Sequence, residues 1–363
     1  MTLADLDLGA LRFRTHRERA DLLASACASN PDLASFETIG ESLEGDPIPG
    51  ITLGYGPRRV TLMAGAHADE PVGPETLTTL VAEGLAARGW GASGGGLADL
   101  FERFTFRIIP HVNPAAEVAN WGWIERHDPA DVAGSLSRFL RWRRRERPGM
   151  DVEFGYPDLR PENRAATAFL FRTGPVALHA SLHGMAFSEG ALLLIEKKWL
   201  GSDRDAALRT AFERAAGAAG LPLHDHDRRG DKGFRYAGPG FWSTPEGEAM
   251  RQHFMDAGDP ETAAWFRRSS MEEAMRTTPG ESPLCVVTEL PMFRISAGGG
   301  ERQRGVASHA VAFREAMPGL LADASDGVDL QPAVERFGIT CPDLATQVRV
   351  HLKTLDAALA AIG

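Results

Sequence analysis

The chain has 363 residues, of which 43% are hydrophobic and 24% charged, and its formal net charge is −10. This composition indicates a globular protein, and the negative charge argues against a nucleic-acid partner, which would require a basic surface. No apolar run approaches the roughly 18 residues of a membrane span, and the N-terminus lacks a signal-peptide pattern. Three widely spaced cysteines do not suggest a disulfide framework. We therefore expect a cytoplasmic protein without a membrane or nucleic-acid partner.

Helical and strand patterns alternate along most of the chain. The predicted helices cover 14–29, 74–88 (closed by Gly89), 161–172 and 203–219, with two or three more from about 302. The predicted strands are two or three between 36 and 64, then 104–110, 176–184, 192–196 and 282–293. Residues 91–96 and 222–248 look like loops, and 115–150 like an insertion that carries a basic run. This alternation predicts an α/β fold with a mixed, largely parallel sheet covered by helices on both faces. Without a repeat or a linker, we expect a single domain over 1–363.

The strongest indication of a functional site lies between Val60 and Gly73, where an apolar run is followed by His67 and Glu70. Pro71 suits the first turn of a helix, so His67 and Glu70 would lie at a strand-to-helix corner. An imidazole nitrogen and a carboxylate oxygen are ordinary zinc ligands, and a catalytic zinc usually takes a third protein ligand and a water. The same pair could also be an exposed histidine and a solvated glutamate, so the pattern alone leaves both interpretations open.

Two further predicted strands end on residues of the same kind, His183 and Glu289. In open α/β sheets, ligands bind outside the carboxyl ends of the strands, so we expect these residues to share a site with His67 and Glu70. His179 competes with His183 as the third metal ligand, because alternate residues of a strand point to the same face.

From about Phe13 to Leu290, the chain resembles the zinc carboxypeptidases of the carboxypeptidase A type. The matching segments, in order, are IGESLEGDPI (39–48), AGAHADEPVG (64–73), PHVNPAA (110–116), DVEFGYP (151–157), PENRAATAFL (161–170), ASLHG (180–184) and VTELP (287–291). The resemblance implies one Zn²⁺ per chain, held by His67, Glu70 and His183. It also implies that Glu289 acts as general base and acid on a peptide or small amide substrate.

The resemblance further implies that one arginine of the run 138–147 stabilises the oxyanion; Arg144 is our first choice and Arg143 the second. Substrate contacts are expected from four residues at family-like positions: Asp46, Asn113, Glu153 and Phe154.

The chain departs from the family where the substrate's carboxylate is bound. Asp46 stands in place of an arginine, and Glu153 and Phe154 stand in place of an Asn-Arg pair. These replacements predict a substrate without the usual free terminal carboxylate, unless Arg160 or Arg164 takes over. Two alternatives stay open: an N-acyl amino acid deacylase with the same zinc chemistry, or a non-catalytic metal-binding protein. The sequence indicates neither the pathway nor the oligomeric state.

Overall fold

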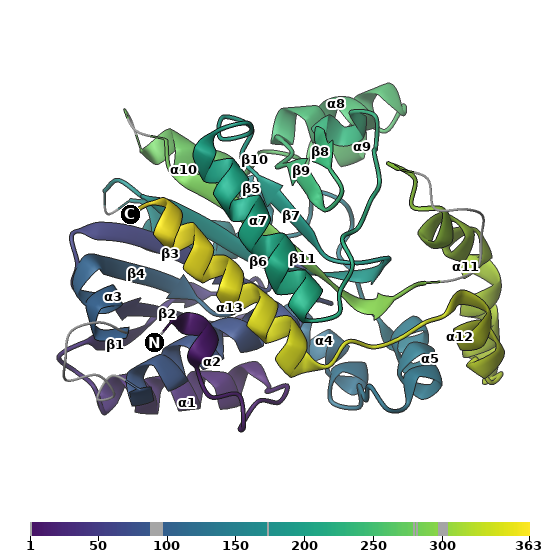
Figure 1. Cartoon of the computed structure of the whole chain (residues 1–363), viewed down its shortest axis with the longest axis horizontal. Helices are drawn as coiled ribbons and strands as arrows, with labels where there is room; N and C mark the ends of the chain where they lie inside the picture. Colours follow the sequence, from purple (N-terminus) through teal and green to yellow (C-terminus); the bar gives the residue numbers. More distant parts are fainter. Residues whose placement is uncertain (1, 88–96, 173, 279, 281, 297–303) are drawn as a thin grey trace.

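The computed structural model describes residues 2–363 except 88–96, 173, 279, 281 and 297–303. A nine-stranded sheet runs through the molecule in the order β1-β2-β4-β3-β6-β11-β7-β9-β8 (Figure 1). Its strands are β1 Ala34–Glu41, β2 Pro47–Leu53, β3 Arg58–Ala64, β4 Phe104–Ile109, β6 Leu178–Ser188, β7 Leu192–Ile195, β8 Tyr236–Gly238, β9 Phe241–Ser243 and β11 Leu284–Arg294. The central strands β4, β3, β6 and β11 are parallel, and antiparallel pairs flank them on both sides. The predicted mixed α/β sheet is confirmed.

Helices cover this sheet on both faces. They are α1 His16–Ala28, α2 Val72–Ala86, α3 Leu97–Arg103, α4 Pro114–Ile124, α5 Val132–Trp142, α6 Pro161–Ala166, α7 Asp203–Ala218, α8 Gly247–Asp256, α9 Pro260–Ala263, α10 Ser270–Thr277, α11 Ser308–Asp326, α12 Gln331–Phe337 and α13 Leu344–Ala361. Helices α2, α7 and α13 pack on one face, as Figure 1 shows. Two smaller elements are the π-helical turn η3 Thr167–Phe171 and a small sheet of β5 Phe154–Tyr156 and β10 Arg268–Ser269. Phe169 of η3 and Tyr156 of β5 belong to the smaller of two apolar cores, which is described next.

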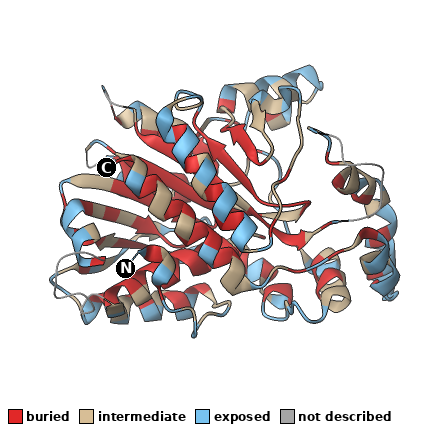
Figure 2. Ribbon diagram, viewed as in Figure 1, coloured by how far each residue is buried: buried red, intermediate tan, exposed pale blue. Residues whose placement is uncertain are grey.

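The central strands are buried almost throughout (Figure 2), which explains the apolar runs of β3 and β11. Strand β6 instead alternates apolar residues with His179, Ser181 and His183, and these polar side chains are buried as well. Alternate residues supply two cores. Leu62, Leu182 and Leu290 belong to the larger one, whereas Met63 and Val287 belong to the second. His183 of β6 and Glu289 of β11 point to the face of the sheet that carries the second core.

Most predicted elements are confirmed, including three helices beyond residue 302. The expected insertion 115–150 contains most of α4 and all of α5, and the expected loop 222–248 contains β8 and β9. The predicted end at Gly89 and the loop 91–96 lie outside the described residues. Within the described part of the chain, no helix is long and apolar enough to span a membrane, and Cys27, Cys285 and Cys341 are free and buried.

The expectation that two strands end on His183 and Glu289 is wrong. Strand β6 continues to Ser188, beyond its predicted end at 184, because the residues after His183 go on pairing with those after Glu289. Strand β11 ends at Arg294, one residue beyond the predicted range 282–293. Strand β3 does stop at Ala64, opposite Leu182. His183 therefore lies at the first position of β6 that β3 no longer covers.

Candidate metal centre

A tight turn after β3 places the first two candidate ligands. Gly65 has φ +71°, and a side chain there would meet the ring of His111 at 2.6 Å, so the turn requires glycine. The loop then presents His67 and Glu70, and α2 begins at Val72 with Pro71 as its N-cap. A Cβ on Gly73 would lie 2.3 Å from the carbonyl oxygen of Leu182. The absence of a side chain at Gly73 thus lets α2 approach β6 and brings Glu70 to His183.

His67, Glu70 and His183 converge on one point. His183 Nδ1 lies 3.1 Å from His67 Nδ1 and 2.9 Å from Glu70 Oε2, and His67 Nδ1 lies 2.8 Å from Glu70 Oε1. Among the described residues, these three form a group that could hold a metal ion, with all ligand atoms within 4.8 Å of one another. Two ring nitrogens that face each other beside a carboxylate need a shared proton or cation between them. Two imidazoles and one carboxylate are a donor set that fits zinc.

The electrostatics of the group also favour a cation. Burial lowers the pKa of His67, but the charge and hydrogen bond of Glu70 outweigh it and raise the pKa to about 10. The pKa of His183 is likewise well above its ordinary value despite burial, again chiefly because of Glu70. The pKa of Glu70 is lowered, since the two histidines outweigh its own burial. A positive charge at the meeting point of these side chains is therefore stabilised.

Glu153 and Ser270 fix the orientation of His183. With Nδ1 directed to the other ligands, His183 Nε2–H can donate to Glu153 Oε2 at 3.1 Å, and Ser181 Oγ lies 2.7 Å from the same nitrogen. The hydroxyl of Ser270 donates to Glu153 Oε1 at 3.2 Å, close to where β5 and β10 pair Phe154 with Ser269. A carboxylate behind a ligating imidazole fixes its tautomer and increases its basicity.

Glu289 completes the site. It lies directly opposite His183 in the parallel pair β6–β11, so the two side chains share a face of the sheet. Burial raises the pKa of Glu289 to about 8, and the nearby charge of Glu70 adds to this increase. Glu289, His67 and His183 line a cavity of about 100 Å³ whose other walls are largely apolar: Phe154, Leu194, Phe234, Met271 and Val287. The site therefore combines a cation-binding end with an acid–base group and room for a small apolar moiety.

A family model described as zinc carboxypeptidase matches residues 20–115, a segment that includes His67 and Glu70. The resemblance to zinc carboxypeptidases is confirmed. Proteins named inactive metallocarboxypeptidase ECM14, from Ajellomyces capsulatus strains H143 and G186AR, are 35% and 31% identical over 98 residues. Each match covers 25% of this chain, and this chain spans only 16% of the length of each relative.

Among solved structures, a metallo-carboxypeptidase from Burkholderia cenocepacia is 15% identical, with a TM-score of 0.49 and coverage of 97% of this chain and 70% of that one. Carboxypeptidase A from Helicoverpa armigera is 14% identical, with a TM-score of 0.46 and coverage of 99% and 75%.

The two arginines of the run that were expected to stabilise an oxyanion, Arg144 and Arg143, lie in different surroundings. Arg144 is exposed; its backbone N–H and carbonyl are held by Asn120, and its side chain donates to the carbonyl of Arg143. Arg143 is half-buried and donates through Nε and Nη2 to Asp69, the neighbour of Glu70. Its guanidinium also lies over the ring of Phe139 at 4.8 Å. Of these two arginines, Arg143 is therefore the one that contacts the loop after β3, which carries His67 and Glu70.

Two expected substrate contacts lie elsewhere. Asp46 is 3.7 Å from His16 Nε2 and does not line the cavity. Asn113 donates to Glu146 Oε1 at 2.5 Å, and Glu146 Oε2 accepts from the backbone N–H of Ala68 at 3.4 Å. Asn113 thus braces the loop that carries the ligands. Of the four predicted contacts, Phe154 and Glu153 line the cavity, but both oxygens of Glu153 are engaged.

The structure also places His179, the alternative third metal ligand, and Arg160 and Arg164, the arginines that could replace the missing pair. His179 is fully buried, with Nδ1 2.9 Å from Thr61 Oγ1, and it lies outside the metal group. Arg160 donates to Glu162 and to the carbonyl of Met150, so its side chain is already held. Arg164 is exposed and is not part of the cavity wall.

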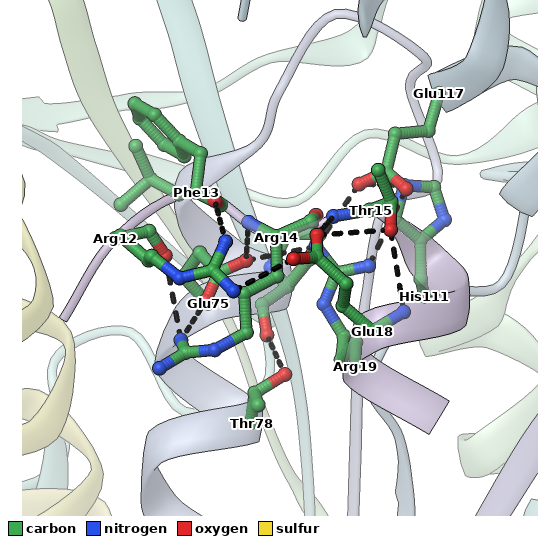
Figure 3. Close-up of polar contacts among 12 residues, drawn as sticks. Arg12, Phe13, Arg14, Thr15, Glu18, Arg19, Glu75, Thr78, His111 and Glu117 are labelled. Atoms are coloured by element: carbon green, nitrogen blue, oxygen red, sulfur yellow. Dashed lines mark hydrogen bonds and ion pairs between the residues drawn. The ribbon is translucent and has the colours of Figure 1, made fainter. Parts of the chain in front are cut away.

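A buried ionic network fixes the helices next to the metal loop (Figure 3). Arg19 of α1 donates to Glu75 Oε1 at 2.9 Å and to Glu117 Oε1 at 3.0 Å, and Arg14 donates to Glu75 Oε2 at 2.7 Å. Glu75 lies in the first turn of α2 and Glu117 in the first turn of α4. The network therefore ties α1 to the helix that begins just after Glu70.

Our reading of the sequence missed Arg228. Its guanidinium carbon lies 4.6 Å from the ring centroids of both Phe234 and Trp242, and Phe234 lines the cavity. The segment around Arg228 has no helical or strand periodicity, and no motif of the family match includes it. Only its mixture of arginine and aromatic residues distinguishes it from an ordinary loop.

Proposed function

We propose that this protein is a zinc-dependent amide or peptide hydrolase that binds about one Zn²⁺ per chain. The observation that carries the proposal is the convergence of His67, Glu70 and His183 at a cavity that Glu289 lines together with the two histidines. Zinc held by these three side chains would supply Lewis acidity toward a carbonyl and a water molecule. The family match over residues 20–115 supports the same chemistry.

In the proposed reaction, Glu289 accepts a proton from the attacking water and returns it to the leaving nitrogen. A carboxyl group with a pKa near 8 can exchange protons near neutral pH, and bound zinc would lower that pKa by offsetting the charge of Glu70. The apolar walls hold the substrate and exclude bulk water. Arg143, fixed by Asp69 next to Glu70, is the better of the two predicted oxyanion donors.

The expectation of a substrate without a free carboxylate loses most of its basis. It required Asp46 and Glu153 to face the substrate, but Asp46 lies beside His16, and Glu153 is bound to His183 and Ser270. We therefore propose a peptide or small amide as the substrate, without the condition that it lacks a free carboxylate. The proposal also covers an N-acyl amino acid deacylase, which would use the same groups. We also retain the proposals of a single domain and a cytoplasmic location.

A non-catalytic metal-binding protein is the second candidate, because the relatives named above are called inactive. That name comes from a match of 98 residues, whereas His67 and His183 alone are 116 residues apart. The match therefore cannot include the complete group. The presence of Glu289 opposite His183 favours catalysis, because a metal-binding protein does not need a proton acceptor there.

Metal analysis and turnover of Glu289→Gln separate these candidates. The wild type should contain about one zinc per chain and cleave at least one of three substrate types: dipeptides, acyl amino acids or amidated peptides. Glu289→Gln should keep the zinc and lose turnover by ~100-fold or more. Glu102→Gln, an exposed α3 residue whose described contact is the Tyr55 hydroxyl, is the matched control. Zinc binding with no turnover in the wild type would support the non-catalytic alternative, and absence of zinc binding would refute both.

A further inference from the structure

A second cavity, with a volume of about 440 Å³, lies away from the metal group. Three segments that are far apart in the sequence form its wall: residues 11–13 ahead of α1, residues 121–129 at the end of α4 and after it, and residues 342–347 at the start of α13. Figure 1 shows the start of α13 beside α4. As far as the structure describes the chain, no residue lines both this cavity and the one beside the metal group. The volume is in the range of small-molecule sites.

Rings make up much of the wall of this second cavity. The side chains of Phe13 and Trp121 and the pyrrolidine rings of Pro129 and Pro342 all line it. Rings of this kind lose little conformational freedom when a ligand binds, and aromatic rings favour stacked or edge-to-face contacts with other rings. The wall therefore favours a flat, largely apolar ligand.

The two charged residues of the wall already have ion-pair partners. Arg12 Nη2 lies 2.7 Å from Glu18 Oε1, and Glu125 Oε1 lies 3.5 Å from Arg126 Nε. Burial lowers the pKa of His127, another wall residue, to about 4, so its ring is neutral near pH 7. The described wall thus offers no unpaired charge, and it suits a neutral ligand better than an ion.

Gln347 contributes a hydrogen-bond acceptor that the protein does not use. Gln347 lines the cavity and is only 1% exposed. Its Nε2 donates to the carbonyl oxygen of Pro342 at 3.0 Å, which fixes the orientation of the amide, because a flipped amide would place two acceptors face to face. Among the described residues, no group donates to Oε1. A buried acceptor without a donor costs free energy, so a ligand that supplies the donor should gain affinity here.

We propose that this second cavity binds a small, neutral, flat aromatic molecule whose N–H or O–H group donates to Gln347 Oε1. Indoles and phenols have this chemistry: the ring system contacts the ring-lined wall, and the single donor pairs with the unused acceptor. The site is separate from the metal group, so the inference does not depend on the proposed hydrolysis.

Two isomers test the role of the donor. 3-Methylindole and 1-methylindole have the same ring system and the same number of atoms, but only 3-methylindole carries an N–H group. Isothermal titration of the full-length protein should show that 3-methylindole binds about 10-fold or more tightly than 1-methylindole, as expected of one hydrogen bond to an otherwise unpaired buried acceptor. This comparison uses the wild type, so it requires no variant to fold.

Two substitutions test whether binding occurs in this cavity. Leu344→Trp enlarges a wall residue and should abolish binding of both isomers, whereas the same change at Leu321, an exposed residue of α11 outside the wall, should leave binding unchanged. Gln347→Met removes the acceptor at similar side-chain length, so it should make the two isomers bind equally. Equal affinity of the isomers for the wild type, or no binding of either, would overturn the inference. A preference for 3-methylindole that survives in folded Leu344→Trp would also overturn it, because the ligand would then bind elsewhere.

Discussion

Glu153→Gln tests whether the carboxylate behind His183 supports metal binding. In the structure Glu153 Oε2 lies 3.1 Å from His183 Nε2 and Oε1 accepts from Ser270 at 3.2 Å. A hydrogen bond to a charged acceptor contributes roughly 1.5–3 kcal/mol and a neutral one about 0.5–1.5 kcal/mol. The nearly isosteric amide should therefore weaken zinc binding by about 1–1.5 kcal/mol, or roughly 10-fold, near the lower end of the effects known for such outer-shell changes.

The assay is competition for zinc between the protein and a chelating indicator at constant pH. Asp46→Asn is the matched control, because it also converts an acid to its amide but lies beside His16 instead of the metal group. Ser270→Ala should give a smaller loss than Glu153→Gln, since it removes only the bond to the far oxygen. If Glu153→Gln bound zinc within about twofold of the control, the carboxylate would not support His183, and a direct role toward substrate would regain weight.

Three further predictions follow from buried charges. Because the pKa of His67 is about 10 in the metal-free protein and the pKa of His183 is also raised, zinc must displace at least one proton at pH 7. The zinc affinity should therefore fall by about tenfold or more per pH unit from pH 9 to 6, and calorimetry in different buffers should detect the released protons. Burial lowers the pKa of His179 to about 4 and of His351 to about 3. Below pH 6.5 the unfolded chain therefore binds protons that the folded one does not, and urea titration should show a loss of about 2 kcal/mol per group by pH 5, less in His351→Gln. Glu117→Gln, which weakens the buried network around Arg19 in Figure 3, should cost about 3 kcal/mol of unfolding free energy, whereas the exposed Glu125→Gln should cost little.

Local sequence predicted the sheet well, because the buried strands show either an apolar run, as in β11, or an alternation of apolar and polar residues, as in β6. The length of β6 was harder to predict. Gly184 looks like a strand end, yet β6 goes on pairing with β11 as far as Ser188. A break in apolar sequence does not end a strand when its neighbour continues to supply hydrogen bonds. Short elements such as β8 and β9 were missed because three residues carry too little periodicity.

The proximity of the candidate metal ligands was predictable for a different reason. His67 and Glu70 are three residues apart on a turn that Gly65 forces, so their proximity follows from local geometry. His183 and Glu289 needed only the parallel pairing of two recognisable strands. Arg143 and Arg144, in contrast, are adjacent in a non-helical segment, and which one turns inward depends on Asp69 as partner. Which of two adjacent arginines turns inward depends here on a residue far away in the sequence, so the arginine-rich segment alone does not predict it.

The polarity of the cavity shows the same dependence on tertiary contacts. Glu153 occupies a position from which the resemblance predicts substrate contact, but the pairing of β5 with β10 brings Ser270 to it, and His183 takes its other oxygen. Both oxygens of Glu153 are therefore bound by groups of the protein itself. Arg228 is far from every matched segment, yet the β7–β9 pairing puts its aromatic support on the face of Glu289. The type of a charged residue therefore does not by itself decide whether it faces a substrate, because partners from distant strands and helices can engage it, as His183 and Ser270 engage Glu153.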